Sequence, residues 1–187
     1  MYTTVRYTAE VGTFFPKDGK PEFRESSLKV PLVGNTNIGR AYPEEQGLCD
    51  GGVFGNIDHP NKVIVSEVIR FVGRPSYNGK KLIIPNDSDG FSGRISRNHG
   101  QLRLSEGEID FYQHLSESGM KTALWVPSDG LVEKVDQASQ LMKLHFKDEN
   151  KPQVDRYLLL GGQEGPSLEE RFPVFSYYVM IRRNQPE

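Results

Sequence analysis

The alternation of apolar and polar positions predicts a chain built mainly from short β-strands. The clearest case is Pro173–Arg183, where Tyr177, Val179 and Ile181 share one face and Tyr178 and Met180 share the other. Runs rich in β-branched and aromatic residues predict further strands at 2–8, 11–15, 22–24, 28–33, 62–72, 80–84, 91–95, 101–104, 121–126 and 156–160. The dipeptides Asp18-Gly19 and Asn78-Gly79 are typical of hairpin turns.

Helical signals are fewer. Ser105 and Glu108 have the spacing of a capping box, which predicts a helix that ends at Gly119. A second helix is predicted from Asp129 to Met142, although Met142, Leu144 and Phe146 also alternate as in a strand. Ser167 and Glu170 predict one further helical turn. The pattern as a whole predicts a single α+β domain over residues 1–187, mainly antiparallel β, sandwich- or barrel-like, with two or three short helices.

Between two predicted strands lies a long Gly-rich segment, 34–61, with the period of neither a helix nor a strand. Loops of this length without secondary structure are uncommon in compact domains, and many of them are functional. The segment also carries apolar side chains, which gain free energy only when another surface covers them. We therefore expect an arm that contacts other protein subunits, with Tyr42, Leu48, Phe54 and Ile57 as its anchors.

Composition narrows the class of protein. The chain has 187 residues and a net charge of −2, so it is neither a strongly basic nor a strongly acidic protein. Its single cysteine, Cys49, rules out an intramolecular disulfide and suits a reducing compartment. No apolar run approaches the roughly 18 residues of a membrane span, and the first residues lack the pattern of a secretory signal. We expect a soluble, cytoplasmic protein without a membrane partner.

The charge is distributed unevenly. Segment 62–103 contains eight cations and three anions, a net charge of +5, which leaves −7 for the rest of the chain. A basic face with interleaved aromatic residues could follow a phosphate backbone and stack on bases. It could equally be an ordinary solvated strand surface, or attract the acidic part of a second copy. The candidate nucleic-acid residues are Arg70, Arg74, Lys80, Lys81, Arg94 and Arg97.

Catalytic and metal signals are weak. Segment 34–41 resembles a phosphate-binding loop, but Arg40 and Ala41 replace the required Lys and Ser or Thr. Segment 86–90 has the oxygen-rich composition of a calcium loop, but Pro85 and Ser96 occupy its first and twelfth ligand positions. Cys49 with His59 or His99 could in principle form a nucleophile and base, but a lone Cys in a Gly-rich loop is more often an inert thiol. We predict no catalytic residue, no cofactor and no metal site.

The leading hypothesis from the sequence is a non-enzymatic structural subunit of a homo- or hetero-oligomeric assembly. A virion component, such as a phage head, neck or tail protein, is one example of this class. The first alternative is a nucleic-acid-binding protein that uses the basic 62–103 region. The second is a metal-dependent enzyme that uses Asp87, Asp89 and His99.

Overall fold

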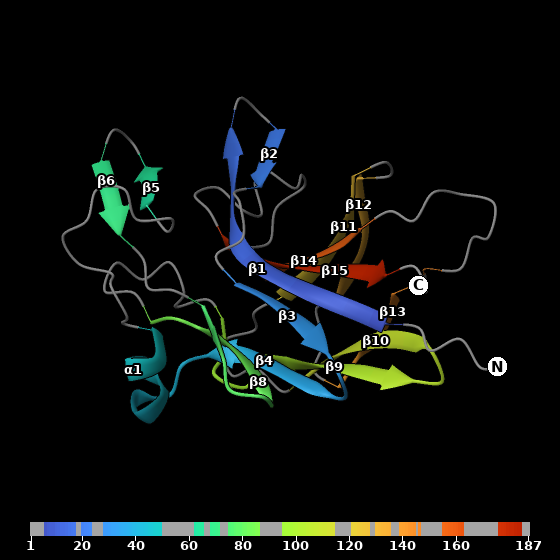
Figure 1. The fold of residues 1–187 in the computed structure, drawn as a ribbon. Coiled ribbons are helices and arrows are strands. Elements are labelled where there is room, and N and C mark those ends of the chain that lie inside the picture. The colour runs from blue at the N-terminus through green and yellow to red at the C-terminus, as the bar shows by residue number, and fades with distance from the viewer. Residues whose placement is uncertain are drawn as a thin grey trace.

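The computed structural model describes residues 6–17, 20–23, 28–49, 62–65, 68–71, 75–86, 95–114, 121–127, 130–135, 139–144, 146, 155–162 and 176–184. These residues form two β-sheets that pack face to face, with a two-stranded hairpin beside them (Figure 1). No helix within these ranges is long and apolar enough to cross a membrane.

The first sheet, sheet A, is antiparallel throughout. Its strands are β1 (Arg6–Lys17), β2 (Lys20–Phe23), β3 (Leu28–Leu32), β11 (Lys121–Val126), β12 (Gly130–Val135), β14 (Arg156–Gly162) and β15 (Ser176–Asn184). The order is β12-β11-β14-β15-β1-β2, with β3 also paired to β1. The first and last strands of the chain therefore lie side by side, from Arg6 opposite Asn184 to Phe14 opposite Ser176. Along its other edge, β1 pairs with β3 over residues 7–11 and with β2 over residues 14–17.

The second sheet, sheet B, carries the candidate site. It contains β4 (Thr36–Arg40), β7 (Ser76–Tyr77), β8 (Lys81–Ile84), β9 (Gly100–Ser105), β10 (Glu108–Gln113) and β13 (Leu141–Leu144), in the order β13-β10-β9-β4-β8-β7. Only the β4–β8 pair is parallel. The remaining strands β5 (Lys62–Val65) and β6 (Val68–Phe71) pair with each other as a hairpin.

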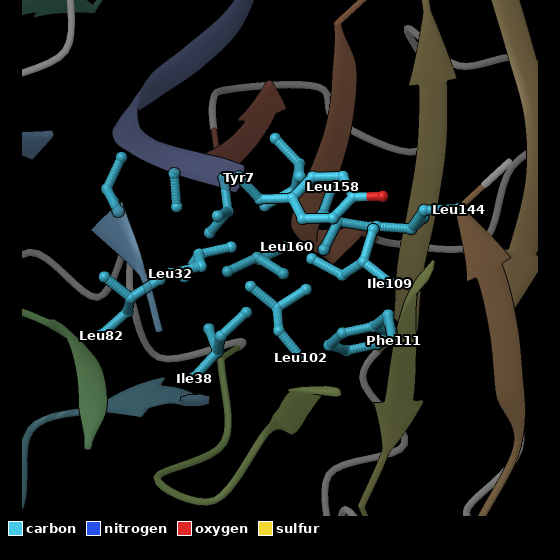
Figure 2. Close-up of a cluster of buried hydrophobic side chains, with 14 of the residues drawn as sticks. Tyr7, Leu32, Ile38, Leu82, Leu102, Ile109, Phe111, Leu144, Leu158 and Leu160 are labelled. Carbon is cyan, nitrogen blue, oxygen red and sulfur yellow. The ribbon is translucent and has the colours of Figure 1, made fainter. Parts of the chain in front are cut away.

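The hydrophobic core fills the space between the two sheets (Figure 2). Alternate residues of each strand point inward, as the two-residue period of a strand requires. Sheet A contributes Tyr7, Val179, Leu158 and Leu160, and sheet B contributes Ile38, Leu82, Leu102, Ile109, Phe111 and Met142. The mainly β, sandwich-like architecture predicted from the alternation is therefore present.

The predicted helices agree with the structure less well than the predicted strands do. The described residues contain one short α-helix, α1 (Gln46–Cys49), after the 3-10 turn η1 (Pro43–Glu45), not two or three helices. The predicted helix after Ser105 is wrong, because β9 and β10 form a hairpin there. Glu106 and Gly107 both have positive φ, 50° and 79°. This is the backbone of a tight two-residue hairpin turn, and the capping-box spacing spans that turn by coincidence.

The predicted helix from Asp129 to Met142 is also wrong. Residues 130–135 and 141–144 form strands β12 and β13. In β13, Met142 and Leu144 are buried whereas Leu141 and Lys143 are exposed, so the strand alternative noted for this segment is correct. The helical turn predicted at Ser167 and Glu170 lies outside the described residues.

Much of the Gly-rich segment 34–61 has regular structure. Thr36–Arg40 is strand β4 in the middle of sheet B, and Pro43–Cys49 forms η1 and α1. The expectation of neither helix nor strand is therefore wrong for these residues, and 50–61 lie outside the described part of the chain.

Gly39 weakens the strand pattern in the sequence. In the structure it gives room for the backbone of Arg97, because a Cβ there would overlap the Arg97 carbonyl oxygen.

Candidate functional site

The η1–α1 segment presents two of the predicted anchors at the surface. It lies against the outer face of sheet B, to the left of β4 and β8 in the view of Figure 1. The Tyr42 side chain is 38% exposed and the Leu48 side chain is 55% exposed. The other two predicted anchors, Phe54 and Ile57, lie outside the described residues.

A small apolar cluster fixes this segment to the sheet. Ala41, Cys49 and Ile83 are completely buried and pack against one another. Ile83 belongs to β8, where its neighbours Leu82 and Ile84 point into the core on the opposite face. On β8, the outward-facing Ile83 is therefore covered by Ala41 and by Cys49 of α1.

A polar core lies beside this cluster. The Nζ of Lys81, whose residue is only 8% exposed, donates to Glu45 Oε1 at 2.8 Å and to the carbonyl of Arg40 at 3.1 Å. The same carboxylate oxygen accepts the backbone N–H of Tyr42 at 2.8 Å. Burial alone would raise the pKa of Glu45. The pKa is nevertheless lowered, because burial is outweighed by the hydrogen bonds from Lys81 and Tyr42 and by the charge of Lys81.

The Tyr42 ring is held by two cations. Lys81 Nζ lies 4.6 Å from the ring centre and the Arg97 guanidinium carbon lies 5.7 Å from it. Cations near an aromatic ring are attracted by its quadrupole, most strongly where water is excluded. The buried Lys81 therefore restrains the ring from the protein side, although Tyr42 remains partly exposed.

Asn86 connects this segment to the end of β8 through four hydrogen bonds. Its backbone N–H and carbonyl pair with the side-chain amide of Gln46, both at 3.1 Å. Its side chain donates to the carbonyl of Ala41 at 2.9 Å and accepts from Arg40 Nη1 at 3.1 Å. The amide of Asn86, which in the sequence resembled part of a calcium loop, thus holds the η1–α1 segment in place.

The basic candidates are only partly brought together. Arg97 and Lys80 are exposed, and Arg97 lies beside Tyr42. Lys81 is buried in its ion pair with Glu45, so it differs from the solvent-facing phosphate ligand that the sequence suggested. Arg70 belongs to β6, of which only the backbone is described, and Arg74 and Arg94 lie outside the described residues.

The structure separates the catalytic candidates. Cys49 is buried under α1, whereas the His99 ring points between the sheets, where its Nε2 lies 2.7 Å from Thr122 Oγ1 on β11. Thr122 in turn donates to Gln113 Oε1 at 2.9 Å. Burial, followed by the charge of His114, lowers the pKa of His99 to about 4, so the ring is neutral at pH 7.

A neutral His99 suits this hydrogen-bond chain. Ser96 N–H approaches Nδ1 at 3.4 Å, which leaves the proton on Nε2 to be donated to Thr122. His99, Thr122 and Gln113 are all buried. They form a polar connection between the two sheets, so the position of His99 is that of a structural residue. His59, Asp87 and Asp89 lie outside the described residues.

The cavity found among the described residues is too small for a cofactor. A cavity of about 30 Å³ near the β9–β10 turn is lined by Tyr7, Gly107, Phe146 and neighbouring residues. This volume suits one or two water molecules and is much smaller than a cofactor pocket. Within the described ranges, no three His, Cys, Asp or Glu side chains converge as metal ligands.

Comparison with other proteins gives no family. No protein-family model matches the sequence. A search of curated proteins finds no significant match either. The function is therefore argued from the geometry of the site.

Proposed function

We propose that this protein is a non-enzymatic subunit of a protein assembly, and that it binds a second copy of the chain through Tyr42 and Leu48. The observation that carries this proposal is the exposure of both side chains on a base of buried ion-paired and hydrogen-bonded groups. Tyrosine is enriched among the residues that dominate interface energy, because its rigid ring buries a large area at low entropic cost.

The rigidity of the base supports the same conclusion. Binding is weakened by the entropy lost when a flexible surface becomes ordered. Lys81, Glu45 and Asn86 already fix the backbone on both sides of Tyr42 in the free chain. Less entropy is then lost on association than for a free arm, so a small contact can contribute more affinity.

A second copy is the proposed partner because of the charge distribution. Arg97 borders the site, within a sequence segment of net charge +5, whereas the rest of the chain carries −7. Surfaces of opposite sign on identical molecules favour association and fix its orientation. Catalysis is less well supported, since the only enzyme candidates described are the enclosed His99 and the buried Cys49.

The test is the solution mass of the full chain, measured by size-exclusion chromatography with light scattering. The wild-type protein is expected to form an oligomer whose fraction rises with concentration. Tyr42→Ser and Leu48→Ser should each shift the equilibrium toward the monomer by about thirtyfold, the loss expected for a residue that contributes about 2 kcal/mol to an interface.

The matched control is Val33→Ser, which removes an apolar side chain that is 85% exposed elsewhere on the surface. This variant should associate like the wild type. A wild-type protein that remains monomeric at every concentration would exclude the second copy as partner. Equal weakening by all three substitutions would show that general surface hydrophobicity, not this site, drives association.

A further inference from the structure

The outer face of sheet B carries a second feature, which extends from Lys81, beside Tyr42, across the sheet to β13. Since Ile109, Phe111 and Met142 point into the core, the intervening residues of β10 and β13 point outward. The strand registers place four outward side chains in one row across β13, β10, β9 and β4: Leu141, Tyr112, Gln101 and Asn37. The row ends at Lys81 on β8, and five strands spaced ~4.8 Å apart give it a length of about 19 Å.

Side-chain contacts order this row before any ligand arrives. Arg103 Nε donates to Gln101 Oε1 at 2.9 Å, and Gln101 Nε2 donates to Asn37 Oδ1 at 3.1 Å. The Arg103 guanidinium carbon lies 4.0 Å from the centre of the Tyr112 ring. The ring also meets His114 edge-on at 5.3 Å. The result is a guanidinium group held over an aromatic ring, with the Arg103 side chain positioned by its hydrogen bond to the Gln101–Asn37 amide chain.

This face remains accessible and carries charged side chains of both signs, with Glu108 and Asp110 beside Arg103 and Lys143. Leu141 is 44% exposed, and Arg103, Tyr112, Gln101 and Asn37 are each half-buried. Asp110 lies between two cations, opposite Arg103 on one side and Lys143 on the other. Burial, followed by the charge of Arg103, lowers the pKa of His114. Arg97 adds a further cation where its backbone crosses Gly39 of β4.

We propose that this face of sheet B binds single-stranded nucleic acid, with a base stacked on the Arg103–Tyr112 pair and the phosphates directed toward Lys143 and Arg97. Bases in single strands stack on aromatic rings and on guanidinium planes, and the exposed face of a sheet is one platform for such stacking. The amide groups of Gln101 and Asn37 lie next to the stack, where they can meet base edges.

Single-stranded nucleic acid fits this surface better than an acidic peptide does. A peptide carboxylate would use the cations, but it would make no use of the planar stack. A double helix hides the faces of its bases, so it offers nothing to stack on Arg103 and Tyr112. Arg97 lies beside both sites, but the Arg103–Tyr112 pair contacts neither Tyr42 nor Leu48, so the Arg103 variants test this proposal separately from the other.

The experiment measures the fluorescence anisotropy of labelled single-stranded oligonucleotides of about 12 nucleotides, poly(dT) and poly(U), with the full chain. Binding is expected at about 50 mM salt and should weaken steeply by about 200 mM. Each Lys or Arg side chain that binds a phosphate releases a counterion from the nucleic acid, and higher salt opposes this release. Arg103→Gln should weaken binding about tenfold and reduce the salt slope by about 1. Arg103→Lys keeps the charge and loses the plane, so it should weaken binding nearly as much as Arg103→Gln.

Lys29→Gln is the matched control, since it removes one exposed positive charge from β3 of the other sheet. It should change affinity less than twofold, and circular dichroism melting curves should show that every variant folds. No anisotropy change for either oligonucleotide at about 50 mM salt would overturn the proposal. Equal weakening by Arg103→Gln and Lys29→Gln, or full competition by poly-glutamate at matched charge, would also overturn it, because both results indicate recognition of charge alone.

Discussion

Gly39 shows how one residue can decide the structure around the site. It lies in β4, between β8 and β9, and the backbone of Arg97 passes directly over it. The same backbone brings the Arg97 side chain to Tyr42. The close approach needs a residue without a Cβ, and therefore couples the middle of sheet B to the surroundings of Tyr42.

Gly39→Ala is expected to lower the free energy of unfolding by about 3 kcal/mol or more, because one of the two backbone segments must move. Urea denaturation followed by circular dichroism measures this change. Gly34→Ala is the control, because a Cβ at Gly34 meets no atom within 4 Å. It should change stability by less than about 1 kcal/mol. Similar effects of the two substitutions would contradict the proposed close approach.

His99 links stability to pH. Its folded pKa of about 4 is below the ordinary value of 6.5, so the unfolded chain binds more protons between these two values. The free energy of unfolding should therefore fall as the pH drops from 6.5 to 4, by about 3 kcal/mol at ~1.4 kcal/mol per pKa unit. The His114 pKa is also lowered, so His114 acts in the same direction.

His99→Gln should flatten the pH dependence of the unfolding free energy across this window, as measured by urea titrations at a series of pH values. The substitution also removes the ring that contacts Thr122, so the variant is expected to be less stable at pH 7. His114→Gln should keep most of the slope. If wild type and His99→Gln gave parallel curves, His99 would not be the group that titrates.

At the scale of secondary-structure elements, the sequence predicted strands well and helices poorly, for a physical reason. In 176–184 and 141–144, the alternating side chains occupy the two faces of a strand. Packing of one or both faces in the folded protein stabilises the strand. Capping-box spacing involves only two residues and competes with turns such as Glu106-Gly107. Short helical signals without a long apolar stripe were therefore overruled by strand pairing.

The η1–α1 element should depend on the Lys81–Glu45 pair. Lys81→Met leaves the Glu45 carboxylate without its cation in a site where that side chain is 16% exposed, so stability should fall by about 2 kcal/mol. Glu45→Gln should also destabilise the protein. The double variant should lose less stability than the sum of the two single losses, since each single substitution leaves the remaining side chain without its ion-pair partner. Strict additivity in urea denaturation would show that the pair does not support the element.

At the scale of the whole molecule, a mainly antiparallel sandwich was predictable, but its assembly around the site was not. The base of the site joins residues 36 to 46 positions apart, such as Glu45 with Lys81 and Arg40 with Asn86. No local pattern encodes such contacts. Tyr42 and Leu48 were found as candidates because apolar residues in a polar, Gly-rich stretch need a covering surface. The sequence did not reveal that Gln46, Asn86 and Lys81 would hold them rigidly.

Association of this protein is expected to cover the η1–α1 segment. Amide hydrogen exchange of the full chain, compared between dilute and concentrated solution, measures this protection. The account predicts that exchange in 42–49 slows at high concentration, while exchange around Val33 stays the same. Association that leaves 42–49 unchanged and protects another region would contradict it.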